Sequence, residues 1–163
     1  MKYMKLKTSE RKDLLSDLEE MPNFLASSFV HLDKDTTKKR SINGGFSPIE
    51  HVWHLADLEQ EGFAVRLNKL LKTNNPNLPD FEGGKIAKER NYRSLNLSDG
   101  LKAFSSARKQ NISTIKQINE SQWYKEGNLE GVGSITLCDL PEMLYQHDSE
   151  HKKEIKAWLN ESA

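Results

Sequence analysis

Apolar residues recur at steps of three and four in four separate segments of this chain, and this spacing is what most restricts its fold. Such spacing places apolar side chains along one face of an α-helix, and that face has to be buried. No stretch shows the strict apolar/polar alternation of a half-buried strand. The sequence therefore predicts an all-α fold, a four-helix bundle with long connecting loops.

The first expected helix covers residues 8–31 and contains Pro22. Proline has no amide proton and its ring clashes with the preceding turn, so we expect a kink or a short break near residues 20–21. A basic, polar loop is expected at residues 33–45, where Gly44 and Gly45 close it.

The second expected helix has the clearest start in the chain. Ser47, Pro48 and Glu50 provide an N-cap, a proline at the first helical position and the glutamate of a capping box. The helix should run to about Lys72, with apolar residues on more than one side. A crowded core or a partner subunit would explain that distribution. The connection that follows, residues 73–97, is long enough for a crossover between bundle helices.

The last two expected helices are separated by a glycine-rich segment. The third helix should begin at Ser98 and Asp99 and end near Asn119. Residues 121–136 carry three glycines and should form a loop that could contain a short hairpin. The fourth helix should begin near Asp139, with Pro141 in its first turn.

Length and charge exclude several classes of protein. A chain of 163 residues suits one domain, residues 1–163. The 24 basic and 24 acidic residues balance, which argues against nucleic acid or an anionic membrane as partner. The single cysteine, Cys138, excludes an internal disulfide and fits a reducing compartment. With no signal-peptide pattern and no apolar run long enough for a membrane span, we expect a cytoplasmic protein.

Two histidines on the fourth helix carry the clearest chemical signal. His147 and His151 are four positions apart, so they stack on one helix face, and they share that face with Leu144 and Ile155. Two imidazoles held in this way can bind one metal ion together. The alternative is a pair of core histidines that are hydrogen-bonded to neighbours or to each other.

A third ligand would have to come from another segment. The candidates are His54 and His51, both on the second expected helix, and His31, which is the weakest because it lies at a helix end. We expect His51 to face solvent or the rim of the site.

With these histidines, the chain resembles a known family, the DinB superfamily, over essentially its whole length. The resemblance lies in three elements, namely Ser47-Pro48 opening a helix, His54-Leu-Ala-Asp57-Leu-Glu59 within that helix, and His147-x-x-x-His151 in the last one. It implies a four-helix bundle, often a homodimer, that binds a divalent metal such as zinc or nickel. The matching ligand positions are His54, His147 and His151. Members are described as metal-dependent hydrolases or as transferases that use a low-molecular-weight thiol.

One departure from the family pattern affects the expected substrate. After its last histidine the family often has a glycine, a glutamine and an aliphatic residue, whereas this chain has Lys153, Glu154 and Ile155. Glu154 could replace the glutamine as a hydrogen-bonding partner. The change leaves the three histidines intact and leaves the substrate class open.

The chemistry of such a site follows from its ligands. Three imidazoles on a divalent ion leave a coordination position open, where a water or a thiol loses its proton readily. Asp57, Glu150 and Glu154 each stand three residues after a candidate ligand, so each could orient a histidine or act as general base. The alternative for these three carboxylates is a solvated surface charge.

The expected function is therefore that of a metal-dependent enzyme, a hydrolase or a thiol-dependent transferase, that acts on a small molecule. The competing hypothesis is a non-catalytic dimeric module that binds metal or another protein. The sequence alone does not separate the two.

Overall fold

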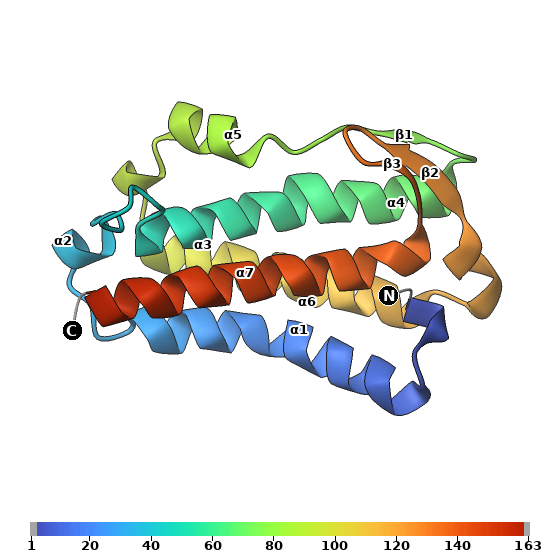
Figure 1. The fold of residues 1–163 in the computed structure, drawn as a ribbon, viewed down its shortest axis with the longest axis horizontal. Coiled ribbons are helices and arrows are strands. Elements are labelled where there is room, and N and C mark those ends of the chain that lie inside the picture. The colour runs from blue at the N-terminus through green and yellow to red at the C-terminus, as the bar shows by residue number, and fades with distance from the viewer. Residues whose placement is uncertain (1–2, 162–163) are drawn as a thin grey trace.

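Four long helical segments lie side by side in the computed structural model, which describes residues 3–161 (Figure 1). The long segments are α1 (Thr8–Phe29), α3 (Pro48–Asp57) continued by a π-helical turn η2 (Leu58–Phe63) and α4 (Ala64–Lys72), α6 (Leu97–Gln117), and α7 (Leu140–Glu161). The short elements are η1 (Tyr3–Lys5), α2 (Lys34–Thr37), β1 (Asn77–Leu78), α5 (Gly83–Arg90), η3 (Tyr92–Ser94), η4 (Glu120–Tyr124), β2 (Glu126–Leu129), β3 (Gly133–Thr136) and η5 (Leu137–Asp139). The predicted all-α four-helix bundle is confirmed.

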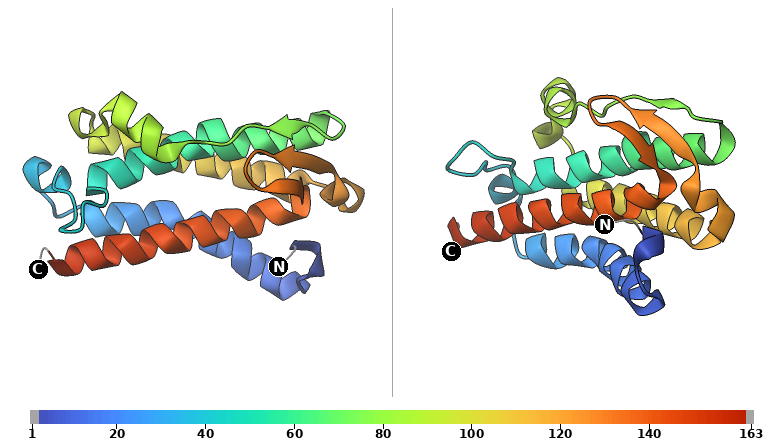
Figure 2. Two further views of the ribbon diagram at one scale, coloured as in Figure 1. Left: turned by 45° about the horizontal axis from the view of Figure 1, so that its top comes forward. Right: turned by 45° about the vertical axis from the view of Figure 1, so that its right-hand side comes forward.

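The direction of the helices explains the long connection between the second and third of them. The α3–α4 segment and α6 run the same way along the bundle, and α1 and α7 run the opposite way (Figures 1 and 2). Because two consecutive helices are parallel, the chain has to return along the whole bundle between them. Residues 73–96 make this crossover over the outside of α3 and α4, and they include β1 and α5.

A small sheet forms at one end of the bundle. Strands β2 and β3 pair as an antiparallel hairpin, with Gly127 opposite Ile135, in the segment expected to be a loop that could hold a hairpin. Strand β1 joins β2 in parallel, with Asn77 opposite Asn128. The sheet therefore ties the crossover to the segment that leads into α7.

The first helix was expected to contain a kink or a short break, and of the two the break is absent. Pro22 lies inside α1, which is one continuous helix, and the N-terminal half of α1 turns away from α7 in Figure 1. Met21 and Leu25, on either side of Pro22, are fully buried. Most helical stability in proteins comes from packing of the apolar face, so this burial holds the helix together across the proline.

The second long helix begins as predicted and then departs from regular geometry. Ser47 and Glu50 form the capping box: the Glu50 amide donates to Ser47 Oγ over 3.4 Å, and the Ser47 amide donates to Glu50 Oε1 over 3.1 Å. Further along, the hydrogen bonds of η2 span five residues instead of four, as from the Ala64 amide to the Glu59 carbonyl, which rotates α4 relative to α3. Such turns are frequent at functional sites, and the sequence offered no sign of this one.

The core is divided into two apolar clusters. One contains Met21, Leu55, Phe104 and Ile155 with their neighbours, and the other contains Leu18, Leu67, Ile112, Leu144 and theirs. On each long helix the two clusters are separated along the chain, and Glu59, Arg108 and Asp148 occupy the level between them.

Arg108 is the centre of this buried polar layer. Its guanidinium donates to Asp148 Oδ2 over 2.7 Å and to Glu59 Oε1 over 2.7 Å, and it also reaches the Leu18 carbonyl over 2.9 Å. Although burial acts against the charge, Glu59 and Asp148 raise the pKa of Arg108. Asn111 donates to the other oxygen of Glu59 over 2.8 Å. The layer thus joins α1, η2, α6 and α7 through paired charges.

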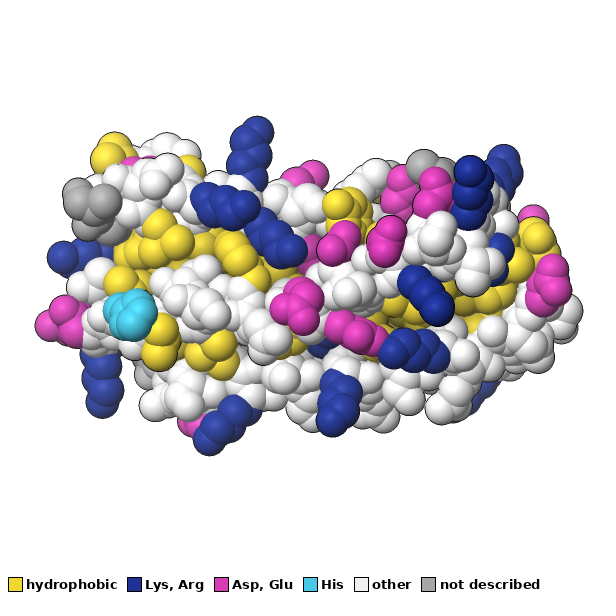
Figure 3. All heavy atoms as spheres, turned by 90° about the horizontal axis from the view of Figure 1, so that it is seen from below, with side chains coloured by type: hydrophobic (Ala, Val, Ile, Leu, Met, Phe, Trp, Pro, Cys, Tyr) yellow, Lys and Arg dark blue, Asp and Glu magenta, His cyan; other side chains and the backbone are white. Residues whose placement is uncertain are grey.

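The surface on the side of α1 mixes charges of both signs with two apolar stretches (Figure 3). None of the helices within residues 3–161 combines the length and apolar character that crossing a membrane requires.

Candidate metal centre

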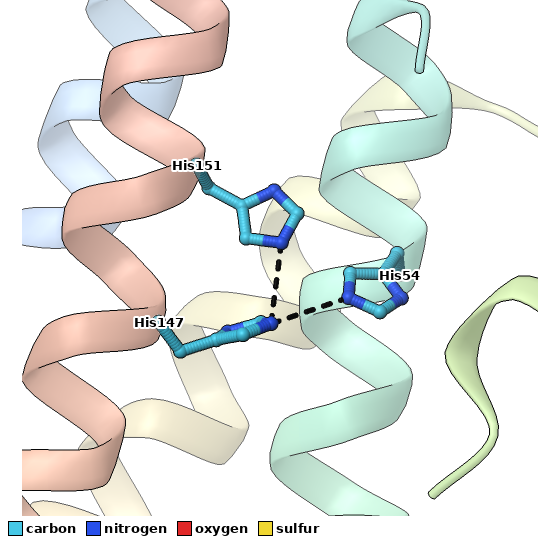
Figure 4. Close-up of side chains that lie close together, drawn as sticks. All are labelled: His54, His147 and His151. Atoms are coloured by element: carbon cyan, nitrogen blue, oxygen red, sulfur yellow. Dashed lines mark hydrogen bonds between the residues drawn. The ribbon is translucent and has the colours of Figure 1, made fainter. Parts of the chain in front are cut away.

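Three histidines from two helices converge at the level of the polar layer. His54 comes from α3, and His147 and His151 come from α7, with their rings turned toward one another (Figure 4). Nε2 of His147 lies 3.5 Å from Nε2 of His54 and 3.2 Å from Nε2 of His151. His54 and His151 are 8% and 6% exposed. The structure therefore brings together the three histidines that the family resemblance indicated.

The spacing of these nitrogens fits a shared divalent ion. Zinc–nitrogen bonds of about 2.0–2.1 Å in tetrahedral geometry put two ligand nitrogens about 3.3–3.4 Å apart. The two observed separations, 3.2 and 3.5 Å, bracket that value. Two further nitrogens, Nδ1 of His54 and Nδ1 of His147, are buried and accept or donate no hydrogen bond within the described residues. Three Nε2 atoms gathered this closely in a largely buried site are costly without an ion or protons between them.

Burial keeps these imidazoles neutral, as metal ligands have to be. Burial, reinforced by the charge of His147, lowers the pKa of His54 to about 4. Burial, with the charges of Arg108 and Arg66, lowers the pKa of His147 to about 4 as well. Burial and the neighbouring histidines lower the pKa of His151 still further. At neutral pH each ring therefore has a free lone pair to offer.

A fourth histidine, His51, belongs to the same cluster, so the expectation that it faces solvent or the rim is wrong. His51 is 2% exposed, and its Nδ1 lies 2.8 Å from Nδ1 of His151. The reason is that His51 and His54 lie one helical turn apart on α3, and both imidazole rings reach the ring of His151, each with its centre 5.0 Å away.

His51, His151 and Glu154 form a second group of potential ligands. However, 2.8 Å between the two Nδ1 atoms is shorter than the separation of about 3.3 Å between co-ligands of one ion, and it is a hydrogen-bond distance. On the other side of the His51 ring, Nε2 lies 4.0 Å from Glu154 Oε2. This group is therefore a polar chain behind His151, which is how ligand histidines are commonly oriented.

The three predicted carboxylates lie in different surroundings. Asp57 is buried, and its hydrogen-bond partners are not histidines: it accepts from Tyr92 Oη over 2.6 Å and from Arg90 over 2.7 Å. Glu150 is exposed and shares a hollow of about 450 Å³ with His51 and Glu154. Glu154 reaches the site through His51, and burial and the charge of Glu150 raise its pKa. A catalytic role for each of the three stays a prediction.

Aromatic rings and one glycine enclose the cluster. The ring of Phe46 lies 5.3 Å from that of His54 and 5.5 Å from that of His51, between ring centres. Gly83, at the start of α5, lies so close to His54 that a Cβ there would be 2.5 Å from its Cε1. The crossover segment therefore packs directly against His54, a candidate metal ligand.

Other features of the site were not predicted from sequence. Gly83 was assigned only to a loop, and its contact with His54 depends on how the crossover folds back. Arg66 on α4 shares a cavity with His54 and His147. The sequence contained a signal for this, because Arg66 is a charged residue on the apolar face of its helix, next to Leu67. His31, the third alternative ligand, is exposed beyond α1 and lies outside the cluster.

The fold of this chain matches that of solved structures of other proteins. The solved structure of YfiT from Bacillus subtilis, described as a probable metal-dependent hydrolase with an unusual four-helix bundle topology, superposes with a TM-score of 0.87. The two chains are 15% identical, and the match covers 96% of this chain and 90% of YfiT. No curated protein matches the sequence.

A second solved structure is that of a mycothiol-dependent maleylpyruvate isomerase, with a TM-score of 0.73 and 10% identity. The match covers 95% of this chain but 63% of the isomerase, so the chain spans less than two thirds of the isomerase's length. These similarities show the fold. The sequence profile of the DinB superfamily matches residues 17–155, and the chain therefore belongs to the DinB superfamily.

Proposed function

We propose that this protein is a metal-dependent enzyme in which His54, His147 and His151 hold a divalent ion, zinc or nickel. Its reaction would be hydrolysis of a small molecule or transfer of a low-molecular-weight thiol to one. The observation that carries this proposal is the convergence of three neutral imidazoles, two buried and that of His147 half-buried, with Nε2 separations of 3.2 and 3.5 Å. The names of the two similar structures support it, since one is a probable metal-dependent hydrolase and the other depends on a thiol.

When bound, such an ion supplies a Lewis acid with an open position, at which a water or a thiol becomes a nucleophile. The chain's own residues prepare that position. Phe46 packs against His54 and limits the access of solvent. His51 accepts or donates a hydrogen bond at Nδ1 of His151 and so holds that ring in place. The 220 Å³ cavity beside His54 and His147 gives a small molecule room next to the site.

The second candidate is a non-catalytic metal-binding or interaction module, which we also expected to be dimeric. Glu154, in place of the family's usual glutamine, is the observation that favours it. Either function is proposed for a cytoplasmic homodimer.

Metal content tests the site itself. Plasma mass spectrometry of tag-free protein should find close to one equivalent of a divalent metal in the parent, and little in a His147→Ala/His151→Ala variant. His31→Ala is the matched control, because His31 is exposed and outside the cluster, and it should keep the metal of the parent. A parent that takes up no metal after incubation with zinc or nickel would refute the proposal. Metal without turnover of esters, amides or thiol acceptors would favour the non-catalytic module.

A further inference from the structure

A buried arginine without a partner lies beside the candidate metal centre. Arg66 on α4 is 6% exposed, and its guanidinium makes no hydrogen bond or ion pair with any residue from 3 to 161. Cζ of Arg66 lies over the ring of Phe63, 5.2 Å from the ring centre. Burial lowers the pKa of Arg66, and the charge of Asp80 offsets part of this effect, but an arginine remains charged at neutral pH. A buried charge in this state is costly.

Arg108, the other buried arginine among residues 3–161, is paired with acceptors. Arg108 is 1% exposed and donates to Asp148, to Glu59 and to a backbone carbonyl. The fold therefore supplies carboxylates to a buried guanidinium where it needs them for structure. At Arg66 it leaves the donors unused, which is the arrangement expected where the partner is a ligand.

The surroundings of Arg66 indicate what that ligand would be. Arg66 lines a cavity of about 220 Å³ together with His54 and His147. The remaining walls are apolar, and consist of Leu58, Phe63, Phe81 and Met143. At roughly 30 Å³ per water the cavity has room for about seven waters, so its occupant is compact. A guanidinium matches the two oxygens of a carboxylate with two parallel hydrogen bonds, and the apolar walls match a hydrocarbon body.

We propose that Arg66 binds the carboxylate of the substrate, which is a compact molecule with an apolar body held beside His54 and His147. This inference rests on the proposed function, because the bound carboxylate is a substrate only if the protein is an enzyme. Binding of a carboxylate at Arg66 does not itself require a metal, so the two can be tested separately.

The test follows the Nε–H signal of Arg66 in nitrogen-15 spectra of the full chain, both metal-free and metal-loaded. Benzoate is the probe, and benzamide, which has the same shape without the charge, is its control. Benzoate should shift the signal, and benzamide should bind at least roughly tenfold more weakly. Arg66→Met keeps an apolar side chain of similar length and should weaken benzoate binding roughly tenfold to a hundredfold, measured by calorimetry.

Two further variants complete the design. Arg66→Lys keeps the charge but loses the planar pair of parallel donors, and its affinity for benzoate should lie between those of the parent and Arg66→Met. Arg93→Met removes an exposed positive charge of η3 and should bind benzoate like the parent. Because Arg66 has no partner to lose, Arg66→Met should fold with at least the thermal stability of the parent and take up the same amount of metal.

The outcomes separate the two proposals. Equal benzoate affinity in the parent and in Arg66→Met, equal affinity for benzamide, or no binding by the parent in either form would overturn the Arg66 inference, even if metal is bound. Arg66-dependent binding of benzoate by a protein that takes up no metal would support the subsite and refute the metal-dependent function.

Discussion

Nδ1 of His51 and Nδ1 of His151 lie 2.8 Å apart, so one of the two nitrogens must carry the proton that joins them. If His151 is to offer a bare Nε2 toward His147 and His54, its proton must be on Nδ1, and His51 must accept it. His51 is then protonated on Nε2, the atom that lies 4.0 Å from Glu154. This hydrogen bond therefore couples the tautomers of the two rings, and the form that binds a metal at Nε2 of His151 is the one in which His51 is the acceptor.

Replacing His51 should weaken metal binding without removing a ligand. His51→Phe keeps a ring but provides no acceptor for His151, and loss of such a partner typically costs roughly tenfold to a hundredfold in metal affinity. Competition with a chelator measures this. His51→Asn, whose side-chain oxygen can accept, is the matched control and should recover part of the loss. Unchanged affinity in His51→Phe would show that the hydrogen bond does not orient His151.

Replacing Gly83 by alanine should weaken metal binding, although alanine adds only one methyl group. A Cβ there would lie 2.5 Å from Cε1 of His54, so Gly83→Ala has to displace the ring or the start of α5. We expect the affinity for zinc to fall by about tenfold or more, as for other losses of ligand orientation. The neighbouring Gly84→Ala is the control, because nothing lies within 4 Å of its Cβ. If both variants bind zinc like the parent, the crossover does not constrain His54.

Arg108 should be essential for stability. Arg108→Met leaves Glu59 and Asp148 buried without their cation, and breaking a buried pair costs about 3–5 kcal/mol. Urea denaturation measures the loss in free energy of unfolding. Lys116→Met breaks the exposed pair with Glu19 and should cost about 1 kcal/mol or less. Similar losses in the two variants would contradict the role assigned to the buried layer.

The metal-free protein should lose stability as the pH falls from 6.5 to about 4. The pKa values of His51, His54 and His147 are lowered from 6.5 to about 4 in the folded chain, so the unfolded chain binds protons in this range that the folded one does not. Stability is therefore complete above pH 6.5 and decreases below it, by about 1.4 kcal/mol per pH unit for each proton taken up on unfolding.

Denaturation of the metal-free protein at a series of pH values tests this expectation. The His147→Ala/His151→Ala variant should show a shallower slope over the same range, because it has fewer buried imidazoles to protonate. Equal slopes would mean that His147 and His151 do not contribute to the acid response in this range.

Local features of the chain were predictable to the extent that they depend on neighbouring residues. The capping box of Ser47 and Glu50 and the stacked pair on α7 follow from spacing within one helix, and both are present. Of the kink or short break expected at Pro22, the break is absent because the burial of Met21 and Leu25, which a local rule does not include, keeps α1 continuous.

The sequence by itself determined the four amphipathic helices, the long crossover and the presence of two histidines on one helix face. The spacing of the residues did not determine which histidine joins them, and only the family resemblance indicated His54. His51 and His54 are three positions apart on α3, so both can face α7, and the packing of the two helices decides that His54 meets His147 while His51 meets the far side of His151. The same packing, with the π-helical turn η2 before α4, places Arg66 in a cavity without a partner. Side-chain periodicity is a property of one helix, whereas these distances depend on the rotation and closeness of two helices, which only the folded core sets.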